Sequence, residues 1–188
     1  MTIGILSFQG DYALHKKALD CLGIKNILVN SISSLLKTDA LIIPGGESTV
    51  FSKFLQFTKL DISIKKYSLT KNIFGTCAGS IIMSKECDDR KVTNLNILDI
   101  KTSRNKWGRQ IDSFEATINI NLCNKVKYLA KFIRAPKIKV LSKNITVLSN
   151  YGNEPVLVRN KLHLASTFHP EMNNNLDIHK YFIGMING

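Results

Sequence analysis

The chain has 188 residues, 44% of them hydrophobic, so it can bury one substantial core, and we expect a single domain over 1–188. Basic residues exceed acidic ones by 26 to 14, but no aromatic residues are interleaved with the lysines, so we favour a solvated basic surface and expect no nucleic-acid partner. The sequence shows no export signal and no apolar run of about 20 residues, so we expect no membrane contact. Its four cysteines form no C-x-x-C pair, so we expect neither a disulfide framework nor a metal site and place the protein in the reducing cytoplasm.

Strands and helices alternate through the N-terminal half. Short apolar runs predict strands and longer amphipathic stretches predict helices. In chain order we expect a strand over Ile3–Phe8, a helix over Tyr12–Leu22, strands over Asn26–Val29 and Ala40–Ile43, a helix over Ser48–Phe57, a strand over Ile73–Gly75 and a helix over Ala78–Lys85. Such alternation is typical of a parallel sheet, so the pattern predicts an α/β fold.

The pattern becomes rich in strands after residue 90. The runs predict strands over Leu95–Thr102, Ser113–Ile120, Lys131–Arg134, Thr146–Leu148, Val156–Arg159 and Leu162–Thr167, and a closing helix over Asp177–Ile186. Two of these strands flank Asn160-Lys161, which predicts a hairpin. We therefore expect antiparallel strands in the C-terminal half of the sheet.

A candidate nucleophile stands between a strand and a helix, in Gly75-Thr76-Cys77-Ala78-Gly79. This is the pattern of a nucleophile elbow, in which glycines on both sides remove Cβ atoms that would collide with neighbouring backbone. The N-terminus of the following helix stabilises a thiolate. The alternative is a buried structural cysteine, the usual state of a free cysteine, and the motif alone does not decide between them.

A candidate base lies near the C-terminus, in Phe168-His169-Pro170-Glu171. The residue before a proline favours extended backbone, in which side chains two apart point the same way. Glu171 can then orient His169 and stabilise its imidazolium. Of the competing histidines, His15, His163 and His179, only His179 has a carboxylate two positions away, and on a helix the side chains of Asp177 and His179 would diverge. Cys77, His169 and Glu171 therefore form the expected catalytic set.

The loop Pro44-Gly45-Gly46-Glu47-Ser48 follows another predicted strand. A Gly-Gly turn can point backbone N–H groups at a developing oxyanion, and we expect the pair to be the N–H groups of Gly46 and Ala78. The alternative is a tight connection in which Ser48 caps the next helix. For a zwitterionic substrate, Glu47 offers a negative group and Arg104 or Arg134 a positive one.

These motifs together resemble the class I glutamine amidotransferases, and specifically the glutaminase subunits of pyridoxal 5′-phosphate synthase, the PdxT/SNO family. Further resemblance lies in Gln9-Gly10-Asp11 with His15, in Arg104-Asn105, Gly108-Arg109-Gln110 and Asp112-Ser113-Phe114-Glu115, and in Ile133-Arg134-Ala135-Pro136. The chain departs from the family at Leu14, at Val50 and over Gln56–Lys71, which concerns the partner interface more than the chemistry.

The resemblance implies a three-layer, flavodoxin-like fold and a Cys-His-Glu triad of Cys77, His169 and Glu171. It also implies glutamine contacts, which come from Gly46, Glu47, Ser48, Arg104, Ile133 and Arg134. The implied activity releases ammonia from L-glutamine without a cofactor, for a (β/α)₈-barrel synthase subunit that contacts the region of Gln9.

Three other functions remain open on the residues alone. The same chemistry could supply a different synthase, and a cysteine hydrolase or redox protein could share the elbow. A catalytically silent protein that binds anionic partners would fit the net charge of +12.

Overall fold

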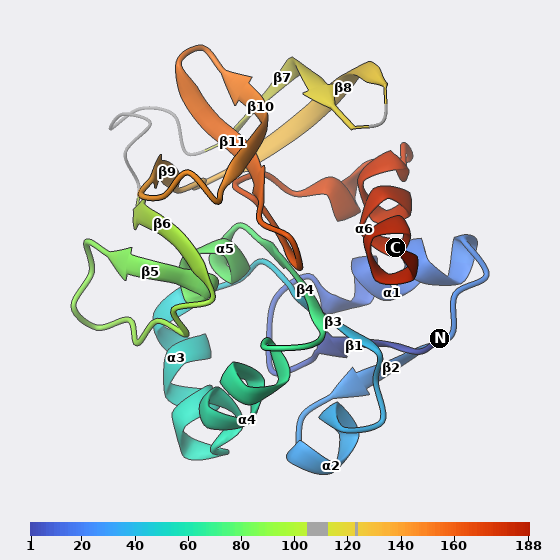
Figure 1. Cartoon of the computed structure of the whole chain (residues 1–188), viewed down its shortest axis with the longest axis vertical. Coiled ribbons are helices and arrows are strands. Elements are labelled where there is room, and N and C mark those ends of the chain that lie inside the picture. Colours follow the sequence, from blue (N-terminus) through green and yellow to red (C-terminus); the bar gives the residue numbers. More distant parts are fainter. Residues whose placement is uncertain (105–112, 123) are drawn as a thin grey trace.

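In the computed structural model, which describes residues 1–104, 113–122 and 124–188, a seven-stranded sheet forms the middle of the protein (Figure 1). The strand order is β10-β11-β12-β4-β3-β1-β2. The parallel strands are β1 (Ile3–Leu6), β2 (Asn26–Val29), β3 (Ala40–Ile43), β4 (Asn72–Thr76) and β12 (His163–Ser166). Two antiparallel strands extend one edge, namely β11 (Glu154–Arg159) and β10 (Thr146–Tyr151). The predicted α/β fold, mostly parallel with antiparallel strands from the C-terminal half, is confirmed.

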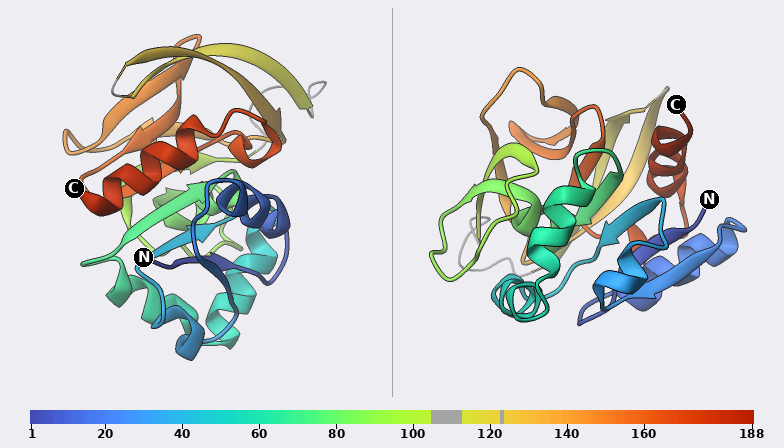
Figure 2. Two further views of the ribbon diagram at one scale, coloured as in Figure 1. Left: turned by 90° about the vertical axis from the view of Figure 1, so that its right-hand side faces the viewer. Right: turned by 60° about the horizontal axis from the view of Figure 1, so that its bottom comes forward.

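Helices cover both faces of this sheet (Figures 1 and 2). One face carries α1 (Tyr12–Cys21) and α6 (Asp177–Asn187); the other carries α2 (Ile32–Leu35), α3 (Ser48–Phe57), α4 (Leu60–Tyr67) and α5 (Ala78–Met83). In β3, Leu41 and Ile43 join the core beneath α3 to α5, while Ala40 and Ile42 join the core beneath α1 and α6. The strand is apolar throughout because both of its faces are buried, and the fold has three layers.

Two smaller sheets flank the central one. One contains β5 (Ser84–Cys87), β6 (Leu98–Ser103) and β9 (Lys137–Val140). The other is a curved ribbon of β7 (Ser113–Asn121) and β8 (Lys125–Ile133), which arches over the C-terminal part of the chain (Figure 2). Its inward side chains, such as Tyr128 and Phe132, pack into the core shared with α1 and α6. The ribbon thereby brings the end of β8 beside the carboxyl ends of the central strands.

Most predicted elements are present with ends shifted by a few residues, and the hairpin is confirmed by the antiparallel pairing of Val158 with Ala165. The helix predicted to reach Lys85 ends at Met83, because the Ser84 hydroxyl donates to the Ile81 carbonyl and the chain continues as β5. β8 begins at Lys125 rather than Lys131, since its outward lysines masked the alternation of buried side chains. The helices and strands not expected were α2, α4, β5 and β9, and the 3₁₀ turn η1 (Pro170–Met172) was not expected either.

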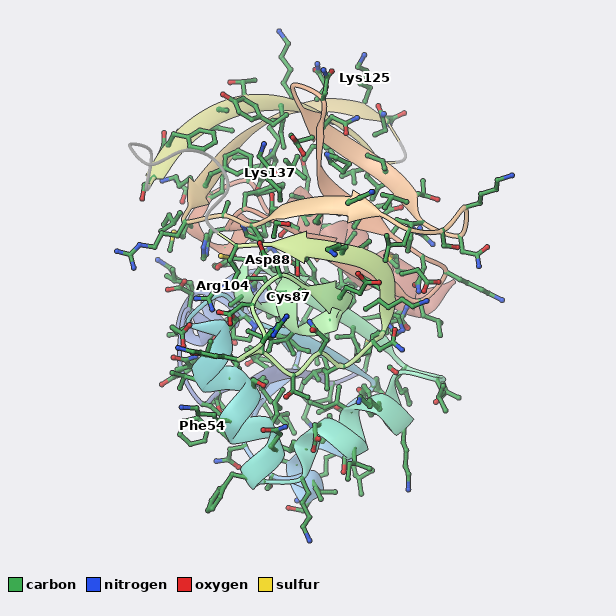
Figure 3. The ribbon with its side chains drawn as sticks, turned by 90° about the vertical axis from the view of Figure 1, so that its left-hand side faces the viewer. Phe54, Cys87, Asp88, Arg104, Lys125 and Lys137 are labelled. Atoms are coloured by element: carbon green, nitrogen blue, oxygen red, sulfur yellow. The ribbon has the colours of Figure 1, made fainter. Side chains whose placement is uncertain are left out.

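The basic surface is partly neutralised by local ion pairs. Lys137 pairs with Glu154 at 2.9 Å and Lys131 with Glu115 at 3.3 Å, whereas Lys125 projects from the tip of its ribbon (Figure 3). These pairs agree with a solvated basic surface. Within the described residues, no helix is both long and apolar enough to cross a membrane.

Candidate active site

Cys77 occupies the sharp turn between β4 and α5. Its backbone lies at φ 48° and ψ −105°, an uncommon conformation for a residue other than glycine, and its N–H donates to the Ser166 carbonyl of β12 at 2.9 Å. A Cβ at Gly79 would lie 2.0 Å from the Ile43 carbonyl oxygen, and one at Gly75 would lie 2.7 Å from the Gly79 carbonyl carbon. The flanking glycines are therefore required by close backbone approach, as the elbow pattern predicts.

The Cys77 side chain is 6% exposed and lies against the end of β8. Its Sγ donates to the Ile133 carbonyl oxygen at 3.6 Å. Ala78 is the first residue of α5, so its N–H has no acceptor within the helix and faces the turn that holds the sulfur. Because α5 has only six residues, its dipole is weaker than the longer predicted helix would give.

His169 and Glu171 meet directly after β12. The Nδ1 atom of His169 lies 2.7 Å from Oε1 of Glu171, and the backbone N–H of His169 donates to the Lys131 carbonyl at 2.9 Å. The expected extended geometry is wrong beyond His169, because the 3₁₀ turn η1 (Pro170–Met172) starts at the proline. The turn nevertheless brings the carboxylate back to the imidazole, so the two side chains form the pair that the motif predicted.

This pair is almost fully buried, with His169 at 3% and Glu171 at 5% exposure. Burial lowers the pKa of His169, but hydrogen bonds with Asp11, Cys77 and Glu171 outweigh it and raise the pKa to about 12. Burial also raises the pKa of Glu171, which the hydrogen bond to His169 opposes. These contacts stabilise the imidazolium, the form that His169 takes once it has accepted a proton, and Cys77 is one of the groups that stabilise it.

Asp11 is a second carboxylate at the same imidazole. Its Oδ2 lies 3.4 Å from Nδ1 of His169 and is partly exposed, whereas Glu171 approaches from the buried side. Ligand atoms of Asp11, His169 and Glu171 lie within 4.8 Å of one another, a spacing that a metal ion could occupy. The hydrogen bond between His169 and Glu171 accounts for this cluster as an oriented imidazole. The sequence motif contained Asp11 but did not show that it reaches His169.

The Gly45-Gly46 loop packs on the imidazole. A Cβ at Gly45 would lie 2.4 Å from Cε1 of His169, and Gly46 has a φ of 149°. The segment after β1 holds this loop, because Gln9 Nε2 donates to the Glu47 carbonyl at 2.6 Å and the Asp11 N–H donates to the Gly45 carbonyl at 3.4 Å. The loop is therefore tied both to His169 and to the segment that contains Gln9.

Glu47 caps α3, so the alternative in which Ser48 is the cap is wrong. The Glu47 carboxylate accepts the Val50 N–H at 2.9 Å and an Arg104 Nη2 bond at 3.0 Å, and Arg104 also pairs with Asp89. Burial raises the pKa of Glu47, but hydrogen bonds from the first turn of α3 and the Arg104 charge lower it overall. Ser48 is buried, and its hydroxyl has no hydrogen-bond partner among the described residues.

Arg134 follows β8 with a left-handed backbone, at φ 44°. Its side chain is exposed, and no described residue pairs with its guanidinium. It stands one residue beyond Ile133, whose carbonyl contacts the Cys77 thiol. The motif residues Asn105, Gly108, Arg109, Gln110 and Asp112 lie outside the described residues.

The sequence model of the SNO glutamine amidotransferase family matches residues 5–188. The chain belongs to this family. It is 40% identical over 187 residues to the pyridoxal 5′-phosphate synthase subunit PdxT of Thermotoga petrophila, covering 99% of this chain and 100% of the relative. It is 42% identical to the subunit of the same name from Pseudothermotoga lettingae, covering 98% and 95%. The resemblance seen in the motifs is confirmed, and the protein is a glutamine amidotransferase.

Solved structures agree with this membership. A crystal structure of a glutamine amidotransferase superposes with a TM-score of 0.93 at 36% identity, over 99% of both chains. A crystal structure from Thermoplasma acidophilum, described as that of a putative GMP synthase protein, has a TM-score of 0.72 at 15% identity, over 100% of this chain and 94% of that one. The second similarity reflects a shared fold, which is the predicted glutamine amidotransferase architecture.

Two further histidines of this SNO family member lie behind Glu171, and sequence reasoning did not connect them to the site. His15 Nε2 is 3.4 Å from Glu171 Oε2 and 3.1 Å from the Thr76 hydroxyl, while His15 Nδ1 is 3.1 Å from His179 Nε2. The available signal was the spacing of His15 with Ala18 and Leu19, which places it on the buried face of α1. That signal predicts burial but not a partner.

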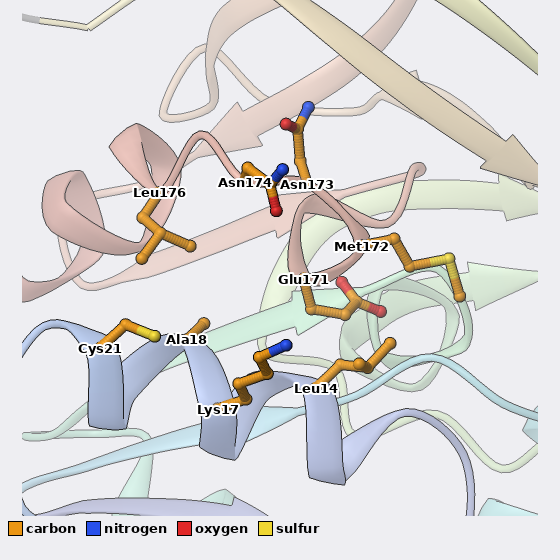
Figure 4. Close-up of a pocket in the computed structure, with 9 residues that line it drawn as sticks. All are labelled: Leu14, Lys17, Ala18, Cys21, Glu171, Met172, Asn173, Asn174 and Leu176. Carbon is orange, nitrogen blue, oxygen red and sulfur yellow. The ribbon is translucent and has the colours of Figure 1, made fainter.

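A cavity of about 340 Å³ separates α1 from η1 (Figure 4). Leu14 and Lys17 line it from the helix, and Glu171 and Met172 line it from the turn. Glu171 is among the residues that line the cavity, and Cys77 is not.

Proposed function

We propose that this glutamine amidotransferase hydrolyses L-glutamine to L-glutamate and ammonia, and that it supplies the ammonia to the barrel subunit of a pyridoxal 5′-phosphate synthase in the cytoplasm. The observation that carries the proposal is the buried His169–Glu171 pair, joined at 2.7 Å, whose imidazole interacts electrostatically with the elbow residue Cys77. A nucleophile, a base and an orienting carboxylate are the three groups that acyl transfer through a thioester needs.

In the first half of the reaction, Cys77 passes its proton to His169 and the thiolate attacks the side-chain amide carbon of glutamine. The sulfur–carbon bond forms, and the carbonyl oxygen takes the negative charge. His169 then donates its proton to the amide nitrogen as the carbon–nitrogen bond breaks, so that ammonia leaves and a γ-glutamyl thioester remains. Glu171 keeps the imidazole in the orientation that permits both transfers.

In the second half, His169 accepts a proton from water as the water oxygen attacks the thioester carbon. The carbon–sulfur bond then breaks, glutamate leaves and the Cys77 thiol is restored. The chemistry uses only groups of this chain and water. We therefore assign no metal or organic cofactor to the reaction.

The negative charge on the carbonyl oxygen would be stabilised by the N–H groups of Gly46 and Ala78. Ala78 begins α5 directly after the nucleophile, and Gly46 lies in the loop that packs on His169. Gly46 follows β3 and Ala78 follows β4, and the carboxyl ends of these neighbouring parallel strands lie at the same edge of the sheet, which suits two donors to one oxyanion. The loop's contacts with the Gln9 segment offer a route by which partner binding could adjust Gly46.

The charged end of glutamine would bind beside the Glu47–Arg104 pair. This pair presents a negative and a positive group side by side, which suits an α-ammonium and an α-carboxylate. Arg134 offers a second guanidinium that no described residue engages. The unpartnered Ser48 hydroxyl and the Ile133 carbonyl would complete the polar contacts.

The partner is proposed from the relatives, which are named as subunits of pyridoxal 5′-phosphate synthase over almost the full length of this chain. Contact near Gln9 would bear on the site because this side chain holds the Glu47 carbonyl. We expect the free subunit to be less active than the complex.

The decisive experiment measures glutamate release from glutamine by the purified chain, alone and with a purified pyridoxal 5′-phosphate synthase barrel subunit. We expect the barrel subunit to stimulate the parent and Cys77→Ala to abolish release. Cys21→Ala removes an exposed cysteine on α1 and serves as the matched control, with parental activity expected. Parental activity in Cys77→Ala would contradict the mechanism, and equal activity with and without the barrel subunit would contradict the proposed partnership.

A further inference from the structure

A line of buried polar side chains continues the triad away from Cys77. It runs from Glu171 to His15 and from His15 to His179, through contacts of 3.4 and 3.1 Å. Both histidines are fully buried, although an imidazole is usually at least partly exposed. They come from α1 and α6, two helices close to the two ends of the chain (Figure 1), and only His15 contacts the carboxylate.

The hydrogen atoms along this line have one consistent direction. The Glu171 carboxylate accepts from His169 through Oε1, and in the ionised form of Glu171 the other oxygen, Oε2, is an acceptor only. A hydrogen on His15 Nε2 then lies between Oε2 of Glu171, at 3.4 Å, and the Thr76 hydroxyl oxygen, at 3.1 Å, and both oxygens can accept it. Burial lowers the pKa of His15, which keeps the ring neutral and leaves Nδ1 as an acceptor. His179 Nε2 therefore donates to His15, and its Nδ1, which has no described partner, is a bare acceptor.

We propose that His15, oriented by His179, is a positioning residue of the glutaminase reaction: its Nε2–H holds Oε2 of Glu171 so that Oε1 stays directed at His169. Oε2 makes no hydrogen bond with any described residue in this geometry, and the nitrogen that forms an ion-pair contact with it is Nε2 of His15, at 3.4 Å. His15 itself touches neither the sulfur nor the proposed oxyanion donors. The proposal rests on the proposed function, because it concerns how the same triad is held.

The chemical effect follows from the burial of Glu171. A buried carboxylate oxygen without a facing donor is costly, so the group would rotate or take up a proton when His15 is removed. Either change weakens the hydrogen bond to Nδ1 of His169 and with it the imidazolium. Because the imidazolium stabilises the Cys77 thiolate, loss of His15 should reduce the reactivity of the sulfur at neutral pH.

Several other titratable groups surround Glu171. His169 and Asp11 face the site side, Lys17 lines the cavity on the other side, and Tyr128 approaches from β8. Of these, only His169 has a hydrogen-bond or ion-pair contact with Glu171 in the described structure. A pH effect of changing His15 should therefore act through the His169–Glu171 pair.

The first test is the tautomer of the two histidines, measured by ¹⁵N NMR of the imidazole rings in the full chain. We expect neutral rings protonated at Nε2 for both His15 and His179 between pH 6 and pH 8, which are roughly the limits over which an ordinary histidine titrates. His15 protonated at Nδ1, with a bare Nε2, would mean that Glu171 donates rather than accepts, and would overturn the proposal. This measurement does not depend on glutamine turnover.

The second test is the rate at which iodoacetamide alkylates Cys77 as a function of pH, followed by mass spectrometry. His15→Leu removes the donor, and we expect about a 10- to 100-fold slower reaction at neutral pH, the effect of losing a hydrogen bond to a charged group. His15→Gln keeps an N–H near the Nε2 position and should recover most of the rate. His15→Gln also keeps the test open if His15→Leu fails to fold.

His163→Gln is the matched control, because His163 is another buried histidine but makes no contact with the triad. We expect its alkylation profile to equal that of the parent. Parental rates in a folded His15→Leu, or an equal loss in His163→Gln, would overturn the positioning role. Failure of the parent to release ammonia would instead refute the proposed function, while these two readouts would still report on the Glu171 contact.

Discussion

Gly79→Ala tests the close approach between the nucleophile elbow and β3. The added Cβ would lie 2.0 Å from the Ile43 carbonyl oxygen and 2.9 Å from its carbon. Real Cβ contacts shorter than 3.0 Å are essentially absent, so the elbow and the strand must separate by about 1 Å. Neither side yields easily, because both atoms belong to backbone in the buried centre of the sheet.

Two magnitudes follow from that displacement. Overpacking of a tight core costs about 1–3 kcal/mol of unfolding free energy, and here the strain falls on backbone, so we expect the upper part of that range. A shift of the sulfur by about 1 Å relative to His169 and the oxyanion donors costs about 100-fold in turnover. Activity should therefore fall more than stability alone explains.

The assay combines urea unfolding, followed by circular dichroism, with glutamate release by the folded variant. Gly184→Ala is the matched control, since no atom lies within 4 Å of its Cβ position on α6. We expect it to raise stability by about 0.5–1 kcal/mol, because alanine favours helix over glycine, with no change in activity. A Gly79→Ala protein with parental stability and turnover would refute the reasoning on the elbow.

His163→Gln should flatten the loss of stability in acid. Burial lowers the pKa of His163 from 6.5 to about 4, so the free energy of unfolding falls by up to about 3 kcal/mol as pH falls from 6.5 through 4. Urea unfolding at several pH values measures how steeply stability depends on pH, and the same dependence in His163→Gln and the parent would contradict the assignment. Arg104→Gln removes the partner of Glu47 and Asp89 and should raise the KM for glutamine about 10- to 100-fold. Because these ion pairs are partly exposed, the free energy of unfolding should change by less than about 1 kcal/mol. Arg90→Gln removes an exposed arginine next to Asp89 and is the control. Equal KM values for glutamine in the two variants would argue against substrate contact.

The fold was predictable where periodicity was strong. β3 and α3 begin and end at the predicted residues, because a continuous apolar run and an amphipathic stretch leave little choice of structure. α2 and α4 were not expected: α2 has only four residues, too few to show a helical period, and α4 follows Lys59, whose left-handed backbone breaks the pattern. Short elements depend on packing, which a single sequence does not display.

The candidate site was predictable as a set of residues and less so as a geometry. Cys77 and its glycines form a local motif, and the structure gives each glycine a backbone neighbour that excludes a Cβ. His169 and Glu171 were paired for a wrong local reason, since a 3₁₀ turn rather than an extended strand brings them together. Side chains two apart can meet in more than one backbone conformation, so the spacing predicts the pair better than it predicts the turn.

The contacts behind the triad could not be predicted because they join distant parts of the chain. His15 and His179 lie 164 positions apart, and two of their ring nitrogens are 3.1 Å apart only because α1 and α6 cover the same face of the sheet. A motif search ranks histidines by nearby carboxylates in sequence, which favours His169 and discards these two. In the structure, Glu171 pairs with His169 through Oε1, and its other oxygen, Oε2, lies 3.4 Å from His15. The same carboxylate therefore gives a second, buried imidazole a polar neighbour. The same packing of the chain ends that completes the fold therefore determines how Glu171 is held.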